Sequence, residues 1–185
     1  MRKAGPDRMP GPRQFARAGT ASQPGAIHVS DTSMRTYRVT QRISAPPDVV
    51  WKFVSDVLAW PEWLPTFDSV IALTDQELQV GSRYRVLQPK LRPAVWAVTS
   101  CRRNESFAWQ SSSPGLAMRA VHALRPTSPD TSELSLEFSF SGALSLPAGL
   151  LAGKLTQRYI SIEAGTFKRL AEDRRDFQHG PCRVA

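Results

Sequence analysis

Cysteine and histidine are scarce in this chain of 185 residues, and long hydrophobic runs are missing. The two cysteines, Cys101 within a strand pattern and Cys182 close to the end, are too few and too far apart for a disulfide framework or a zinc site. No apolar run is long enough to span a bilayer, and the first residues lack the apolar segment of a secretory signal. We therefore expect a soluble cytoplasmic protein that binds no metal and does not insert stably into a membrane.

Sequence motifs of nucleotide, metal and serine-hydrolase chemistry are missing as well. The chain contains no GxGxxG after a strand, no Walker loop, no HExxH and no GxSxG. We expect no cofactor, and any catalysis must use ordinary acid and base side chains.

Positive charge is in excess, with a formal net charge of +8, but it is not concentrated. Residues 1–33 hold five basic and two acidic residues, a net +3, in a stretch rich in Pro, Gly, Ala, Ser and Arg that has too few hydrophobic residues to fold. The remaining charge is spread along the chain without a basic cluster interleaved with aromatic residues, so we expect no nucleic-acid partner. The expected organisation is a disordered arm at 1–33, one domain at 34–176 and a flexible tail at 177–185.

Short alternating segments dominate the chain from residue 35 to residue 141. RTYRVTQRIS is a first strand, PDVVWKFV begins a helix at Pro47, and the tryptophans of WPEWLP lie in a short helical turn or structured loop between two prolines. Period-two alternation then predicts five or six further strands that place aromatic residues on one face and polar residues on the other. We expect an antiparallel sheet.

The last long segment, from about Leu146 to Asp176, has the apolar periodicity of one amphipathic helix. A helical wheel assigns these residues to its apolar face: Ala148, Leu151, Ala152, Leu155, Tyr159, Ile162, Thr166 and Leu170. The simplest arrangement that buries both apolar faces is an α+β fold in which the sheet curves around this helix.

These segments, in this order, resemble the polyketide cyclase/dehydrase-like branch of the START-like (Bet v 1-like, SRPBCC) superfamily. The resemblance rests on ISAPPDVVWKFVSD, the WPEWLP segment, VGSRYRVLQPKLRPAVWAVT and the long C-terminal helix. It implies a helix-grip fold with a seven-stranded antiparallel sheet around the C-terminal helix, two short helices after the first strand and a deep apolar cavity. Members bind lipids, sterols, polyketides or other hydrophobic molecules, and some cyclise or dehydrate them. The resemblance transfers no catalytic motif to this chain.

Two polar residues are candidates for acid–base chemistry. His122 is the only histidine between the arm and the tail, and its strand pattern points it inward, where a neutral imidazole can transfer a proton or simply bond to a backbone carbonyl. Glu163 falls inside the apolar arc of the long helix, where its pKa is raised unless it pairs with an arginine at the edge of the arc. The two form an acid–base pair only if they converge on one cavity.

The remaining candidates would line a hydrophobic ligand site. Trp60 and Trp63, near prolines in a short segment, are candidates for a mobile lid. Tyr84, Gln88 and Tyr159 offer polar groups to a ligand carbonyl. The expected apolar wall consists of Trp96, Trp109, Met118, Phe138, Phe140 and Leu155.

Three functions remain open at this stage. The first is binding of a lipid or polyketide-like molecule, and the second is a cofactor-free cyclase or dehydratase that uses His122 or Glu163 in the same cavity. The third is an adaptor that presents the basic face of Arg83, Arg85 and Arg119 to a membrane or partner. We expect a monomer or homodimer, and the excess of arginine over lysine suggests a bacterial source.

Overall fold

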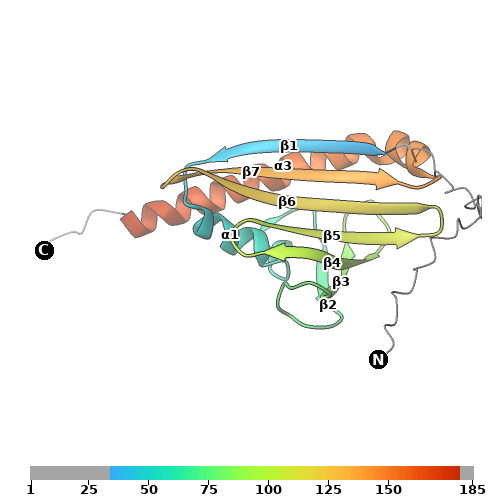
Figure 1. Ribbon diagram of the computed structural model, residues 1–185, viewed down its shortest axis with the longest axis horizontal. Helices are drawn as coiled ribbons and strands as arrows, with labels where there is room; N and C mark the ends of the chain where they lie inside the picture. The colour runs from blue at the N-terminus through green and yellow to red at the C-terminus, as the bar shows by residue number, and fades with distance from the viewer. Residues whose placement is uncertain (1–33, 180–185) are drawn as a thin grey trace, which may run out of the picture. The chain divides into compact units, whose positions relative to one another are not determined.

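The computed structural model describes residues 34–179, so the predicted arm and residues 180–185 of the predicted tail lie outside the described residues (Figure 1). The elements are β1 (Arg35–Ile43), α1 (Pro47–Ser55), α2 (Trp60–Trp63), β2 (Ser69–Ala72), β3 (Arg83–Leu87), β4 (Ala94–Arg102), β5 (Ser106–Ser113), β6 (Leu116–Ser128), β7 (Thr131–Ser141) and α3 (Ser145–His179). Helix α3 thus continues three residues beyond the predicted domain end at residue 176.

All seven strands form one antiparallel sheet in the order β1-β7-β6-β5-β4-β3-β2. Strands β2 to β7 follow one another as a meander, and β1 pairs with the last strand, with Arg35 opposite Phe140. A register shift between Val98 and Ser100 interrupts the pairing of β4 with β5, and such irregularities bend a sheet. This arrangement confirms the predicted helix-grip fold.

The inner face of the sheet carries the aromatic residues that the alternation predicted. Tyr84 and Val86 of β3 are buried while Arg83 and Arg85 are exposed, because successive side chains of a strand point to opposite faces. Helix α3 runs along the inner face beside β1 and β7, and α1 lies against α3 (Figure 1). The core therefore lies between the sheet and α3.

The predicted apolar face of α3 was wrong at Leu151, which is exposed, whereas its other members are half-buried. Leu151 is 88% exposed and Leu150 is 73% exposed, whereas Gly149 and Gly153 are buried. Farther along, the fully covered positions are Ile160, Glu163, Ala164, Phe167 and Ala171. Leu151 lies outside the packed face because Gly149 and Gly153 take the positions closest to β1.

Two glycines let the first half of α3 approach β1 closely. A Cβ atom added at Gly153 would lie 2.1 Å from Oη of Tyr37, and one at Gly149 would lie 3.0 Å from the side chain of Arg35. The Tyr37 hydroxyl donates a hydrogen bond to the Gly149 carbonyl at 3.0 Å. Gly153 is thus required by space rather than by backbone angle.

We expect Gly153→Ala to lower the free energy of unfolding by about 1–2 kcal/mol, because the new methyl group overpacks against the tyrosine ring. Urea denaturation of Gly153→Ala, Tyr37→Phe and the double variant measures this. Removing the hydroxyl in Tyr37→Phe should recover part of the loss, so the double variant should be more stable than additivity predicts. Strict additivity would contradict the close approach.

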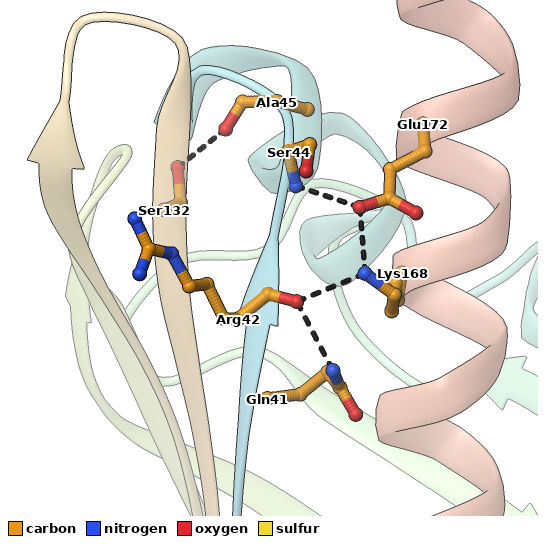
Figure 2. Close-up of polar contacts among 7 residues, drawn as sticks. All are labelled: Gln41, Arg42, Ser44, Ala45, Ser132, Lys168 and Glu172. Atoms are coloured by element: carbon orange, nitrogen blue, oxygen red, sulfur yellow. Dashed lines mark hydrogen bonds and ion pairs between the residues drawn. The ribbon is translucent and has the colours of Figure 1, made fainter.

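A polar network joins the far half of α3 to the β1–α1 connection (Figure 2). Lys168 Nζ donates to the Arg42 carbonyl at 3.1 Å and pairs with Glu172 Oε1 at 2.7 Å. The same oxygen accepts the backbone N–H of Ser44 at 2.7 Å. Burial alone would raise the pKa of Glu172, but the bonds from Lys168 and Ser44 outweigh it and lower that pKa. The network fixes the helix axis relative to the strand.

Candidate ligand-binding cavity

A cavity of about 280 Å³ lies between the inner face of the sheet and α3. The inner stripe of α3 contributes Ala148, Ala152, Thr156, Tyr159, Ile160 and Glu163 to its lining. These positions recur every three or four residues, the spacing of one helix face. The exposed residues Leu91 and Arg92 also line the cavity, so it reaches the surface at the β3–β4 connection.

The wall opposite α3 is aromatic. Trp96 lies 5.3 Å from Trp109 and 5.9 Å from Phe138 between ring centroids, and Phe138 lies 5.0 Å from Phe140. All four come from the inward positions of β4, β5 and β7. Tilted and edge-to-face rings of this kind present a rigid apolar surface to a flat ligand.

Most of the residues chosen from the sequence lie at this cavity. The ones that line it are Trp60, Gln88, Trp96, Trp109, Met118, His122, Phe138, Phe140, Tyr159 and Glu163. Trp63, Tyr84 and Leu155 are not among the lining residues. Trp63 and Tyr84 make structural contacts that account for their positions without a ligand.

The tryptophans of α2 do not form the lid that was predicted. Trp60 is fully buried, and its Nε1–H donates to the carbonyl of Phe53 at 3.1 Å. Trp63 packs edge-to-face on Phe53 at 5.4 Å. Pro61 lies in the first turn of the short helix, where proline is tolerated, and Pro65 follows its C-cap Leu64.

Tyr84 is also a structural residue. Its ring is buried, and its hydroxyl donates to the carbonyls of Gln76 at 3.4 Å and Glu77 at 3.1 Å. Burial raises the pKa of this phenol. The hydroxyl therefore holds the β2–β3 connection and does not face the cavity.

His122 is buried and lies at the cavity wall. Its ring stacks on Phe107 with centroids 4.3 Å apart and planes 6° apart, and Trp60 lies 5.3 Å away. Its Nδ1 is buried and is the one such side-chain atom of the described chain with no hydrogen-bond partner. Burial lowers the pKa of His122 to about 3, so the imidazole is neutral. A buried polar atom without a partner is costly, and a ligand hydroxyl would satisfy it.

Glu163 is the second buried polar group of the lining. The Thr66 hydroxyl donates to its Oε1 at 3.2 Å, and no basic side chain within residues 34–174 forms an ion pair with it. Burial raises the pKa of Glu163 to about 8, although the Thr66 bond opposes this shift. The carboxyl is therefore mostly protonated at neutral pH and can donate a hydrogen bond into the cavity.

Sequence reasoning missed Thr66 and Phe67. Thr66 is fully buried against Glu163, and Phe67 lines the cavity at 4.9 Å from Trp60. They follow Pro65 in a connection without periodicity, so no sequence pattern places them. Tyr159 was expected to orient a ligand carbonyl, but its hydroxyl donates to the Pro89 carbonyl at 2.5 Å and so ties the β3–β4 connection to α3.

No helix of the described chain is long and apolar enough to cross a membrane. Among residues 34–179 no group of three or more His, Cys, Asp or Glu side chains is placed to hold a metal ion.

Solved structures of similar fold include two enzymes. Zhui aromatase/cyclase from Streptomyces sp. R1128 is 17% identical, with a TM-score of 0.66 over 80% of this chain and 99% of that one. Norcoclaurine synthase from Thalictrum flavum is 13% identical, with a TM-score of 0.63 over 90% and 99% of the two chains. A START superfamily protein from Mycobacterium smegmatis is 16% identical, with a TM-score of 0.54 over 77% and 98%. At these identities the likeness shows a shared fold.

A search of curated proteins finds no match to this chain. The model of one family, described as polyketide cyclase/dehydrase and lipid transport, matches residues 34–172. That span includes every strand, both short helices and most of α3. The chain therefore belongs to the polyketide cyclase/dehydrase and lipid transport family, within the START-like fold.

Proposed function

We propose that this protein binds a small, uncharged hydrophobic molecule in the cavity between the sheet and α3. The observation that supports this most strongly is the pair of buried polar groups, His122 and Glu163, in a mostly apolar and aromatic lining. Its charged members are Arg92 at the exposed opening and Glu137, which pairs with Arg38. His122 is neutral because burial lowers its pKa to about 3, and Glu163 is protonated at neutral pH because burial raises its pKa to about 8. Two buried groups that are held neutral favour an uncharged ligand in the interior of the cavity.

The cavity volume limits the size of the ligand. Ligand pockets usually measure about 300–1,000 Å³, and this one, at about 280 Å³, is at the lower end. A molecule of two or three rings suits this volume, whereas a phospholipid with two acyl chains exceeds it. The flat aromatic wall of Trp96, Trp109 and Phe138 favours a planar ligand.

A second candidate function is cyclisation or dehydration of a polyketide-like substrate in the same cavity. A protonated Glu163 can give a proton to a carbonyl or a departing hydroxyl, and the free Nδ1 of His122 can accept one. Both groups line the same cavity, which is the condition that this pair must satisfy. Two proteins of similar fold are named as an aromatase/cyclase and a synthase, which favours this candidate.

Uptake of neutral and anionic dyes tests the binding proposal. We expect neutral N-phenyl-naphthylamine to quench the tryptophan fluorescence, because Trp60, Trp96 and Trp109 line the cavity. The similarly shaped anionic dye anilinonaphthalene sulfonate should bind at least tenfold more weakly. In Ala152→Phe, a ring on the lining stripe of α3 should lower the affinity for the neutral dye at least tenfold.

A matched control is available on the same helix. Gly165 is exposed, and a Cβ added there meets nothing within 4 Å, so Gly165→Phe should leave dye affinity unchanged. Equal affinities for the two dyes, or equal losses in both variants, would contradict the proposed site. Glu163→Gln should keep dye binding within a few fold, and a later loss of turnover in it would support the cyclase candidate.

A further inference from the structure

An exposed surface at the start of α3 is not explained by ligand binding in the cavity. Leu146, Leu150, Lys154 and Arg158 follow one another at four-residue spacing, and all four are exposed. Residues four apart lie on one line along a helix. Together with Leu144 and Leu151 they form what we call the leucine–lysine stripe. A contiguous exposed apolar surface with a charged border marks an interaction site.

The charge of the leucine–lysine stripe has one sign. No acidic residue occurs between Glu137 and Glu163, and the first turn of α3 contains none. Within residues 34–174, Lys154 and Arg158 form no ion pair. The stripe therefore joins uncovered leucines to two unpaired cations, which complements a surface that is apolar and negatively charged.

The stripe lies close to residues that line the cavity. The N–H of Leu144 donates to the carbonyl of Gly115 at 2.9 Å, next to Leu116 of the cavity lining. Ala148 and Ala152, on the inner side of the same helical turns, line the cavity. The start of α3 and the β5–β6 turn lie at one end of the sheet (Figure 1).

More unpaired positive charge lies at the β3–β4 connection. Lys90 and Arg92 are exposed there, and Arg92 lines the cavity beside Leu91. The bond from Tyr159 to Pro89 holds this connection against α3. The cavity opening at the β3–β4 connection therefore also carries positive charge.

We propose that the leucine–lysine stripe docks on the surface of an anionic lipid bilayer, with the cavity opening turned toward the lipid. A basic helix with exposed leucines binds such a surface by burying its apolar side chains at the headgroup boundary while its cations meet anionic lipids. A neutral hydrophobic ligand concentrates in the bilayer, so docking shortens its path to the cavity. Membrane docking is a property separate from ligand binding, and vesicle binding can be measured without a ligand.

Vesicle sedimentation of the full chain tests the docking surface. We expect the protein to bind vesicles of phosphatidylcholine and phosphatidylglycerol at least tenfold more tightly than vesicles of phosphatidylcholine alone, and to dissociate as salt is raised. The variant Leu150→Ser with Leu151→Ser should lose at least tenfold in affinity for the anionic vesicles. The variant Lys154→Gln with Arg158→Gln should lose the preference for anionic lipid.

Matched controls use exposed residues elsewhere. Ile71 and Val80 are exposed hydrophobic residues, and Arg83 and Arg85 are exposed cations of β3. Ile71→Ser with Val80→Ser, and Arg83→Gln with Arg85→Gln, should each bind vesicles as the unsubstituted chain does.

Several results would overturn the proposal. They are no vesicle binding, equal binding to both lipid compositions, and equal losses in the control variants. A dimer in light scattering that becomes a monomer in the leucine variant would assign the stripe to a second copy of the chain instead.

Discussion

Replacing Trp60 by alanine is expected to lower the free energy of unfolding by about 3–5 kcal/mol, the range for removal of a large aromatic side chain from a packed core. Trp60 is fully buried, with ring centroids of Phe67, Trp109 and His122 within 5.3 Å. Urea denaturation followed by circular dichroism measures the change. The alanine variant should also gain cavity volume, because Trp60 lines the cavity.

Two comparison variants separate a core role from a lid. Trp60→Phe keeps an aromatic ring but removes the bond to the Phe53 carbonyl, and should cost less than the alanine variant. Trp63 is half-buried, so Trp63→Ala should cost clearly less than Trp60→Ala. If Trp60→Ala left stability unchanged and altered only the rate of dye entry, Trp60 would be a lid residue and not a core residue.

Stability is expected to be highest between about pH 4.5 and pH 6.5 and to fall on both sides, because two buried groups have pKa values shifted in opposite directions. The pKa of Glu163 rises from 4.5 in the unfolded chain to about 8 in the folded protein. The folded state therefore keeps a proton that the unfolded state loses, and stability falls as pH rises from 4.5 to 8. The pKa of His122 falls from 6.5 to about 3, so its contribution is lost as pH falls from 6.5 to 3.

Between pH 4.5 and pH 6.5 the contributions of Glu163 and His122 to the pH dependence of stability cancel. Above pH 6.5 only Glu163 contributes, and below pH 4.5 only His122 does. At about 1.4 kcal/mol per pKa unit, the loss between pH 6.5 and pH 8 is about 2 kcal/mol, and the loss between pH 4.5 and pH 3 is similar. Glu172, whose pKa is lowered by its bonds to Lys168 and Ser44 despite partial burial, adds to the acid-side loss. Urea denaturation at a series of pH values gives the full profile.

Glu163→Gln is the control for the alkaline side. It should abolish the loss between pH 6.5 and pH 8, because glutamine does not titrate. With the Glu163 slope gone, the His122 slope is no longer cancelled, so the acid-side loss should begin near pH 6.5 instead of pH 4.5. A flat profile from pH 6.5 to pH 8 in the unsubstituted protein would contradict this account, because it would mean that Glu163 is already ionised in the fold.

The sheet was predictable because its signals are local. Period-two alternation assigned Trp96 and Val98 to the inner face of β4, and both are buried. Strand ends were less well placed: β6 runs to Ser128, beyond the predicted end at Arg125, because its pairing with β7 continues past Pro126 through a register shift. Pairing across strands sets such an end, and no single strand's pattern contains that information.

The phase of α3 was not predictable from its composition. The helical wheel assigned Leu151 to the core-facing side, but Leu151 is exposed while Gly153 is buried against Tyr37. Close packing at a glycine depends on the shape of the partner strand, so the helix sequence alone does not reveal it. The same reasoning did place Glu163 in the buried arc, because the second half of α3 follows the ordinary rule.

The cavity lining was predicted in part. Inward strand positions gave His122, Trp109 and Phe138 directly, whereas Thr66 reaches Glu163 from a connection with no repeating pattern. Tyr84 shows the converse error. Its strand position points the side chain inward, but its hydroxyl donates to carbonyls of the β2–β3 connection and is not free to contact a ligand.

Native mass spectrometry tests the central claim most directly, namely that the cavity holds one small neutral molecule. The unsubstituted protein should retain either a co-purified hydrophobic compound or one added molecule of N-phenyl-naphthylamine per chain. Ala152→Phe should retain neither, and Gly165→Phe should behave as the unsubstituted protein. Empty spectra for all three proteins, or equal retention by all three, would contradict the account.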